Sequence, residues 1–187
     1  MNHRLAAFLL AGACCSAHVA AAPPAPAYAG QDGRDIKALS PEDVSGYLSG
    51  KGMGFAKAAE LNGFPGPAHV LELARPLGLT PEQRARTEAL FSSMEARAIG
   101  FGRSLVDRER ALDRLFATKS VTPDLLNRTL AEIGLLQAQV RAAHLEAHLA
   151  QLEILTPEQT ARYASLRGYG STGAHGTPGA HGGRHKH

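Results

Sequence analysis

The sequence predicts an all-α protein, a long antiparallel helical hairpin with shorter flanking helices. Three observations support this fold class. The pentapeptide Leu-Thr-Pro-Glu-Gln occurs twice, at residues 79–83 and 155–159, and its composition is typical of a helix start. Apolar residues recur every three, four or seven positions over two long stretches, which places them along one side of a helix. No comparable strand signal competes with these patterns.

Each copy of the pentapeptide supplies what the first turn of a helix needs. Thr80 and Thr156 can accept a hydrogen bond from an otherwise unpaired amide, and the proline after each threonine suits the first helical position because it lacks an N–H. Gln83 and Gln159, three residues after the threonines, complete a capping box. Two weaker copies of the theme add two more helix starts: Ser40-Pro41-Glu42 and Thr122-Pro123-Asp124.

Residues 1–29 have the composition of a signal peptide with a Pro/Ala-rich end. Arg4 precedes an apolar run from Leu5 to Ala13, and small residues follow. Cleavage is expected after Ala29, with a cut after Ala22 as the alternative. The mature protein is therefore expected outside the cytoplasm.

Both cysteines of the chain, Cys14 and Cys15, lie inside this segment. Cleavage after Ala29 leaves a mature chain without disulfides and without thiol chemistry. Two alternatives stay open. Residues 11–14 loosely resemble a lipoprotein cleavage box, which would place a lipid anchor at Cys14. An uncleaved segment would anchor the chain in the membrane, although the apolar run is short for a spanning helix.

Residues 30–66 form a glycine-rich segment, called the lead-in from here on. Its glycines interrupt short helical pieces around residues 44–48 and 55–61, and each interior glycine weakens a helix by roughly 1 kcal/mol. We expect the lead-in to be flexible and to pack on the hairpin. Beyond a turn at residues 64–67, a short helix over residues 68–77 leads to the first pentapeptide.

Two long helices follow, one over residues 80–118 and one that starts at Thr122. The apolar stripe of the first helix consists of Leu90, Met94, Ala98, Phe101, Leu105, Leu112 and Leu115. The stripe of the second consists of Leu126, Leu130, Ile133 and Val140. The connection at residues 119–121 is so short that the two helices must run antiparallel. Further leucines then need either the shorter helices or a second subunit as partner: Leu135, Leu136, Leu145, Leu149 and Leu152.

The doubled pentapeptide, in an Ala/Leu/Arg-rich helical setting, resembles the signature of the LTxxQ proteins of the bacterial envelope, the Spy/CpxP family. Its motif positions here are Leu79, Thr80, Gln83, Leu155, Thr156 and Gln159. The resemblance extends over about residues 68–169, and it implies a periplasmic all-helical domain at residues 67–169 that forms a curved homodimer. Members of this family include chaperones that hold unfolded clients, an inhibitor of an envelope-stress kinase, and metal-sensing relatives.

Residues 170–187, called the arm from here on, are rich in glycine and histidine. The tetrapeptide Gly-Ala-His-Gly occurs twice, and the histidines are His175, His181, His185 and His187. Such a segment buries too little apolar area to offset the entropy of ordering, so a disordered arm is expected. Neutral imidazoles on such an arm bind zinc, nickel or copper. The alternative is a solubilising tail without a metal function.

His144 and His148, called the His pair from here on, stand one helical turn apart. Both imidazoles leave the same helix face and can share a metal ion. Zinc normally needs three or four protein ligands, and the polar neighbours on that face supply none: Gln137, Arg141 and Gln151. A partner subunit, His69 or the arm would have to complete the site. Metal-sensing relatives carry a His-x-x-x-His pair nearer the start of their periplasmic part. The alternative is that the His pair extends the apolar stripe and bonds to neighbouring side chains.

Charge and motifs disfavour nucleic-acid binding and catalysis. The net charge of +3 includes Arg4 of the signal peptide and both Arg184 and Lys186 of the arm, so no basic face favours nucleic acid. The mature chain has no cysteine nucleophile, no serine in a nucleophile elbow, no phosphate-binding glycine loop and no His-Glu-x-x-His motif. We therefore expect a protein that is not an enzyme and that requires no cofactor.

The resemblance and these exclusions together predict a periplasmic binding protein of envelope-stress protection. It is expected to hold unfolded or partly folded envelope proteins and to bind divalent metal ions. The first alternative is a periplasmic heavy-metal sensor or metal-resistance protein for zinc, nickel or copper. The second alternative is a regulatory partner of a membrane stress-sensing protein.

Overall fold

The structure, a computed structural model, describes residues 26–169. Most of the predicted signal peptide, with Cys14 and Cys15, lies outside the described residues, as do the arm and its histidines His175, His181, His185 and His187. Of the described residues, 26–32 belong to one unit and 33–169 to another. In the first unit the chain makes turns, and Gln31 Nε2 donates to the Ala27 carbonyl. All of the helices in the described residues belong to the second unit.

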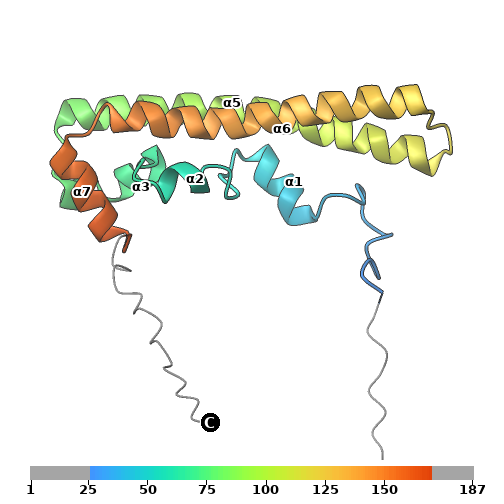
Figure 1. Cartoon of the computed structure of the whole chain (residues 1–187), viewed down its shortest axis with the longest axis horizontal. Coiled ribbons are helices and arrows are strands. Elements are labelled where there is room, and N and C mark those ends of the chain that lie inside the picture. Colours follow the sequence, from blue (N-terminus) through green and yellow to red (C-terminus); the bar gives the residue numbers. More distant parts are fainter. Residues whose placement is uncertain (1–25, 170–187) are drawn as a thin grey trace, which may run out of the picture. The chain divides into compact units, whose positions relative to one another are not determined.

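The described residues contain seven α-helices and no strand. They are α1 (Pro41–Leu48), α2 (Lys57–Glu60), α3 (Pro67–Glu72), α4 (Ala74–Leu77), α5 (Pro81–Ala117), α6 (Pro123–Leu152) and α7 (Pro157–Leu166). The long helices α5 and α6 lie side by side and run in opposite directions (Figure 1). None of the helices described is both long and apolar enough to cross a membrane. The predicted all-α hairpin with shorter flanking helices is confirmed, whereas the dimer stays a prediction.

The short helices pack along the hairpin. Helices α1 and α3 contact α5, α2 contacts α6, and α7 turns back against α4 (Figure 1). A close approach lies at Gly102 of α5, which faces the backbone carbonyl of Tyr47 in α1 with no room for a β-carbon. The lead-in therefore lies directly on the hairpin.

The helix starts form as the sequence predicts, because the capping contacts are local. Gln83 N donates to Thr80 Oγ1 at 3.1 Å, and Thr80 N donates back to Gln83 Oε1 at 3.1 Å. The same reciprocal pair at Thr156 and Gln159 measures 3.2 and 2.9 Å. Asp43 completes a capping box at Ser40, whereas Thr122 only accepts from Leu125 N, at 3.3 Å.

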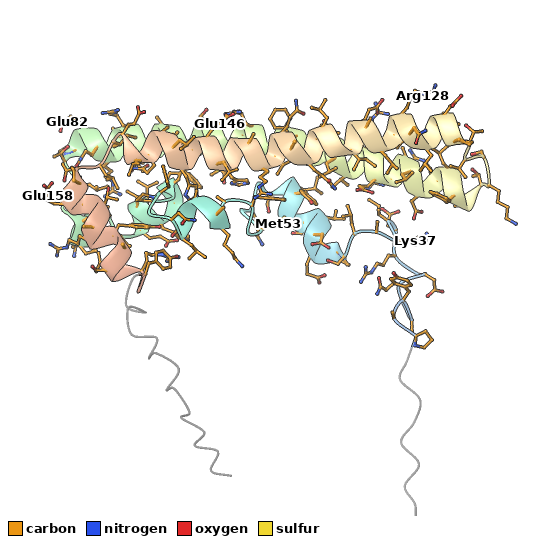
Figure 2. All side chains as sticks on the ribbon, viewed as in Figure 1. Lys37, Met53, Glu82, Arg128, Glu146 and Glu158 are labelled. Atoms are coloured by element: carbon orange, nitrogen blue, oxygen red, sulfur yellow. The ribbon has the colours of Figure 1, made fainter. Side chains whose placement is uncertain are left out.

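Acidic side chains at two of these starts reinforce the same end of the hairpin. Glu82 lies in the first turn of α5 and Glu158 in the first turn of α7 (Figure 2). A backbone hydrogen bond at the helix start is the main cause that lowers the pKa of the Glu82 carboxyl, and the Thr156 hydroxyl is the main cause for Glu158. Both carboxylates are thus stabilised in the charged form that suits a helix N-terminus.

The buried core includes two clusters of apolar residues. Val70, Leu77, Leu155 and Tyr163 pack where α3, α4 and α7 meet. Met94, Ala98, Ala143 and Ala147 pack between α5 and α6. The alanines let the two long helices approach closely, and they leave room beside α6 for the lead-in.

The helix predicted over residues 68–77 is interrupted, which corrects the sequence analysis. Helix α3 ends at Glu72 and α4 begins at Ala74. Pro76 explains the break, because a proline has no N–H to donate to the carbonyl four residues earlier, here that of Glu72, and its ring clashes with that carbonyl.

The stripe predicted on α6 is wrong at one position. Leu130 is 47 % exposed, although Ile133 and Val140 of the same stripe are buried. Near the turn the hairpin has only α5 and α6, and two helices cannot cover every apolar position (Figure 1). Leu135 and Leu149 of α6 are also exposed, at 61 % and 56 %.

Candidate metal-binding pocket

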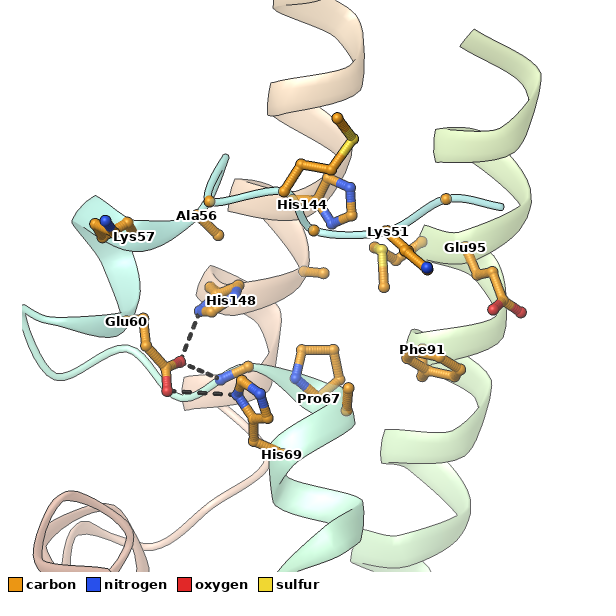
Figure 3. A pocket seen from close by; sticks show the side chains of 18 of the residues that line it. Lys51, Ala56, Lys57, Glu60, Pro67, His69, Phe91, Glu95, His144 and His148 are labelled. Atoms are coloured by element: carbon orange, nitrogen blue, oxygen red, sulfur yellow. Dashed lines mark hydrogen bonds and ion pairs between the residues drawn. The ribbon is translucent and has the colours of Figure 1, made fainter. Parts of the chain in front are cut away.

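The His pair lies on successive turns of α6 and lines one pocket of about 580 Å³ (Figure 3). Only 5 % of His144 and 9 % of His148 is exposed. Ala143 and Ala147, each one position earlier, are buried against α5. The spacing of four residues therefore places both imidazoles on one face, as the sequence predicts, and that face is covered by the lead-in.

His148 is held by the backbone of the lead-in. Its Nδ1 lies 2.7 Å from the carbonyl oxygen of Phe64. A carbonyl can only accept, so in the neutral ring Nδ1 carries the hydrogen and Nε2 keeps a free lone pair. A metal-binding histidine is commonly oriented in this way, with its other ring nitrogen donating to a carbonyl. A β-carbon at Gly66 would lie 2.9 Å from Nε2, so the glycine leaves the space on that side of the ring.

His144 is buried, and one of its ring nitrogens has no hydrogen-bond partner among the described residues. Its ring stacks on Phe55, with centroids 5.9 Å apart and planes at 19°. Its Nε2 is fully buried and has no partner among the described residues. Desolvation, and secondarily the neighbouring His148, lowers the pKa of His144, so the ring is neutral and can donate a lone pair to a metal ion. An orphaned buried polar atom costs about 1–3 kcal/mol, which a bound ion would recover.

Glu60, at the end of α2, is the residue that sequence reasoning missed. Its Oε2 lies 3.7 Å from His148 Nδ1 and accepts from Gly66 N at 3.2 Å (Figure 3). Its Oε1 accepts from the hydroxyls of Tyr163 at 2.5 Å and Tyr169 at 3.0 Å. Through these contacts Glu60 connects its own helix α2 to the start of α3, to α6, and to α7 and the residues that follow it. No local pattern marks it, because all of these partners are distant in sequence or lie in a turn.

Two further polar side chains complete the surroundings of Glu60. Arg167 Nε lies 3.5 Å from Glu60 Oε1, and His69 Nδ1 lies 3.5 Å from the same oxygen. The side chain of His69 is 38 % exposed. His69 thus stands at the edge of the pocket, paired with the carboxylate rather than with the His pair.

Two methionines are among the residues that line the pocket, Met53 from the lead-in and Met94 from α5. Met53 has φ of 42°, in the left-handed region that side chains other than glycine rarely adopt. Its sulfur packs on Gly46 of α1, where a β-carbon would come within 2.5 Å of it. The backbone of the lead-in is thus strained at Met53.

The folded residues supply part of a metal site. Among residues 26–169 no group of three or more His, Cys, Asp or Glu side chains is arranged to hold a metal ion. The imidazoles of the His pair line the pocket, with His69 at its edge, while both oxygens of Glu60 are already hydrogen bonded. The donor set therefore fits a metal that takes imidazole nitrogen, such as zinc, nickel or copper, provided that further ligands come from elsewhere. Metal binding at the His pair stays a prediction.

The motif residues meet at the other end of the hairpin from the turn. Leu79 and Leu155 pack in the cluster around Val70, with Leu155 only 8 % exposed. The side chains of Gln83 and Gln159 hydrogen bond to one another. The two copies of the pentapeptide thus join the start of α5 to the start of α7. They do not line the pocket of the His pair.

Comparison with known families gives one finding. A family model described as heavy-metal resistance matches residues 54–162 of this chain. The searches of curated proteins and of solved structures gave no match to this chain. The matched residues include both copies of the pentapeptide, Glu60 and the His pair, and they make up more than half of the sequence.

Proposed function

The chain belongs to the heavy-metal resistance family, the LTxxQ, Spy/CpxP-type family that its sequence resembles, and on that premise we propose that it protects the bacterial envelope by binding heavy-metal ions. The His pair is the ligand set that the folded domain contributes. On this proposal the protein acts by binding and not by catalysis, and the predicted signal peptide supports a periplasmic location. The observation that supports this best is the buried, unpartnered Nε2 of His144 beside the oriented ring of His148.

The ligand types indicate which ions fit. Imidazole nitrogen suits zinc, nickel and copper, and thioether sulfur favours copper(I). Met53 and Met94 line the same pocket as the His pair. Copper(I) and zinc are therefore the first ions to test, and calcium and magnesium, which take oxygen ligands, should not bind there.

The test is a calorimetric titration of the mature chain with zinc, nickel and, under reducing conditions, copper(I). His144→Ala and His148→Ala should each lower the affinity at least tenfold, because each removes a ligand from an incomplete set. Gln137→Ala, an exposed change on the same helix, is the matched control and should bind as the unmodified chain does. Absence of binding for all three ions would overturn the proposal.

The exposed leucines favour a second function, the holding of unfolded clients. Leu135 and Leu149 lie four helical turns apart on α6, and both are more than half exposed. Exposed apolar side chains are where a chaperone contacts unfolded chains, although a dimer partner would cover them equally well. Leu135→Ser with Leu149→Ser should remove any suppression of client aggregation while leaving metal affinity unchanged. Unchanged suppression would exclude these leucines as the client surface, and a switch from dimer to monomer would assign them to the partner.

A further inference from the structure

Another pocket lies between the lead-in and the end of α5, nearer the turn of the hairpin. Its volume is about 490 Å³. Ile36 and Ala38 line it from the lead-in, and Glu109, Leu112 and Phe116 line it from α5. It shares no lining residue with the pocket of the His pair. This cavity, called the Glu109 pocket from here on, has the size of a small-molecule site.

One face of α5 supplies the helical side of the Glu109 pocket. Glu109, Leu112, Asp113 and Phe116 stand at positions i, i+3, i+4 and i+7, which lie on the same side of a helix. Leu105, four residues before Glu109, is buried with 1 % exposed. Position 109 thus continues a buried stripe, yet it carries a carboxyl, and only 8 % of Glu109 is exposed.

The carboxyl of Glu109 has no hydrogen bond and no ion pair among the described residues. Burial is the cause that raises its pKa, and no neighbouring cation or hydrogen-bond donor offsets this effect. Arg108 and Arg110, its neighbours in the sequence, pair with other carboxylates. Lys37 lines the same pocket, but its Nζ lies 3.3 Å from Asp113 Oδ2, and its backbone N donates to Asp113 Oδ1 at 3.1 Å. Buried charges are ordinarily paired, so Glu109 lacks a partner that its position calls for.

Charge and polarity of the lining define what fits there. Lys37 and Asp113 neutralise each other, so Glu109 leaves the lining with one net negative charge. One free carboxylate is too small a ligand set for a metal ion, and the described residues hold no group of three or more metal-binding side chains. An organic cation with N–H donors can instead form a charge-assisted hydrogen bond to the carboxylate. Its apolar part would cover Ile36 and Phe116.

We propose that the Glu109 pocket binds a small organic cation, an ammonium group on an apolar body, with the Glu109 carboxylate accepting from its N–H groups. Phe116 lines the pocket and is also 55 % exposed, which places it at the mouth, where the apolar body enters. The ammonium group supplies the partner that the described residues do not give Glu109. This site is independent of the proposed metal function, since the two pockets have no residue in common.

Three ligands of nearly the same shape test the proposal on the mature chain. Phenylbutylamine, phenylbutanol and phenylbutyrate carry a positive charge, no charge and a negative charge at neutral pH. Calorimetry should show saturable binding of the amine, with a Kd on the order of 1 mM or lower. The alcohol should bind at least tenfold more weakly, because it lacks the charge-assisted hydrogen bond, and the acid should bind least. In amide NMR spectra the amine should shift the signals of Ile36, Ala38 and Glu109.

Two substitutions separate the carboxylate from the apolar lining. Glu109→Gln keeps the shape of the side chain and removes its charge, so it should lower the affinity for the amine at least tenfold and bring it close to that of the alcohol. Phe116→Ala should weaken the amine and the alcohol alike. Glu88→Gln, an exposed carboxyl of the same helix outside the pocket, is the matched control and should change neither affinity. Helical circular dichroism checks that each variant is folded.

The contrary outcomes are equally distinct. If the alcohol binds as tightly as the amine, or if Glu109→Gln keeps the full affinity for the amine, the carboxylate is not the acceptor and the proposal fails. Shifts confined to Gly66 and Tyr169 would place the amine in the pocket of the His pair and would also overturn it, as would the absence of saturable binding. None of these results bears on metal binding by the His pair, which the zinc, nickel and copper titrations test separately.

Discussion

Gln83 and Gln159, 76 residues apart in the sequence, hold each other by two side-chain hydrogen bonds. Gln83 Nε2 donates to Gln159 Oε1 at 2.8 Å, and Gln159 Nε2 donates to Gln83 Oε1 at 3.0 Å. Each oxygen also accepts from the backbone of its own threonine, and each nitrogen also donates to a carbonyl, Ile154 O for Gln83 and Leu77 O for Gln159. The two helix caps are therefore one hydrogen-bonded unit that closes α7 on the start of α5.

This unit predicts a strong coupling between the two glutamines. Gln83→Ala and Gln159→Ala should each lower the free energy of unfolding by about 1–3 kcal/mol, because each leaves polar groups unpaired. The double variant should cost clearly less than the sum of the two single changes, since either change breaks the shared bonds. Urea denaturation of the four proteins measures the coupling. Gln137→Ala, at an exposed position of α6, should have little effect, and strict additivity would show that the two caps act separately.

Two glycines of α5 should respond to alanine in opposite directions. At Gly102 a β-carbon would collide with the Tyr47 carbonyl, so Gly102→Ala should displace α1 and destabilise the fold by about 1–3 kcal/mol. At Gly100 a β-carbon meets nothing within 4 Å in the described part of the chain. Gly100→Ala should therefore stabilise the helix by roughly 0.5–1 kcal/mol. Thermal unfolding followed by circular dichroism compares them, and equal shifts would contradict the close packing of α1 on α5.

The buried carboxyl of Glu109 predicts a pH-dependent change in stability. Glu109 is 8 % exposed, and desolvation raises its pKa above the ordinary value of 4.5. The folded state therefore binds this proton more tightly than the unfolded state does, and its stabilising effect is lost as pH rises through the folded pKa. Glu109→Gln, which is neutral at every pH, should unfold at a higher temperature than the unmodified chain at about pH 7, and the difference should vanish near pH 4.

The control for this change is Glu72→Gln, a carboxyl that lies on the surface. It should alter the melting temperature little at either pH. A Glu109→Gln variant that is less stable than the unmodified chain at neutral pH would show that the carboxylate takes part in a favourable interaction instead.

Tyr163 should anchor α7 and make the fold sensitive to alkali. Its hydroxyl donates to Glu60 Oε1 at 2.5 Å, and a hydrogen bond to a charged group contributes about 1.5–3 kcal/mol. Tyr163→Phe should lose about that much stability at neutral pH. Burial, and then Glu60, raises the pKa of Tyr163 far above the ordinary value of 10.0, so only the unfolded chain ionises this phenol. The unmodified protein should therefore lose stability as pH rises above about 10, and the variant should lose less.

Denaturant titrations near pH 7 and pH 11 test this expectation. Tyr28→Phe is the matched control, because Tyr28 is 81 % exposed and its removal should change stability at neither pH. If Tyr163→Phe matches this control at neutral pH, the hydrogen bond to Glu60 does not hold α7 in place.

The candidate site was predictable only in part. The spacing of His144 and His148 places both imidazoles on one face of α6, because helical periodicity is a local property. It does not predict that His144 stacks on Phe55 or that Phe64 orients His148. Those contacts depend on where the lead-in packs on the hairpin. Because glycines interrupt the lead-in, helical periodicity does not predict its path.

By itself the sequence determined where α1, α5, α6 and α7 start, how long α5 runs, and that α5 and α6 turn back on each other. Threonine, proline and glutamine cap a helix through contacts three residues apart, and a connection of a few residues leaves two helices only an antiparallel path. The tertiary structure alone decided that Gln83 meets Gln159 and that Glu60 reaches Tyr163, 103 residues away. Such pairings depend on the packing of whole helices against one another, so no local pattern of residues specifies them.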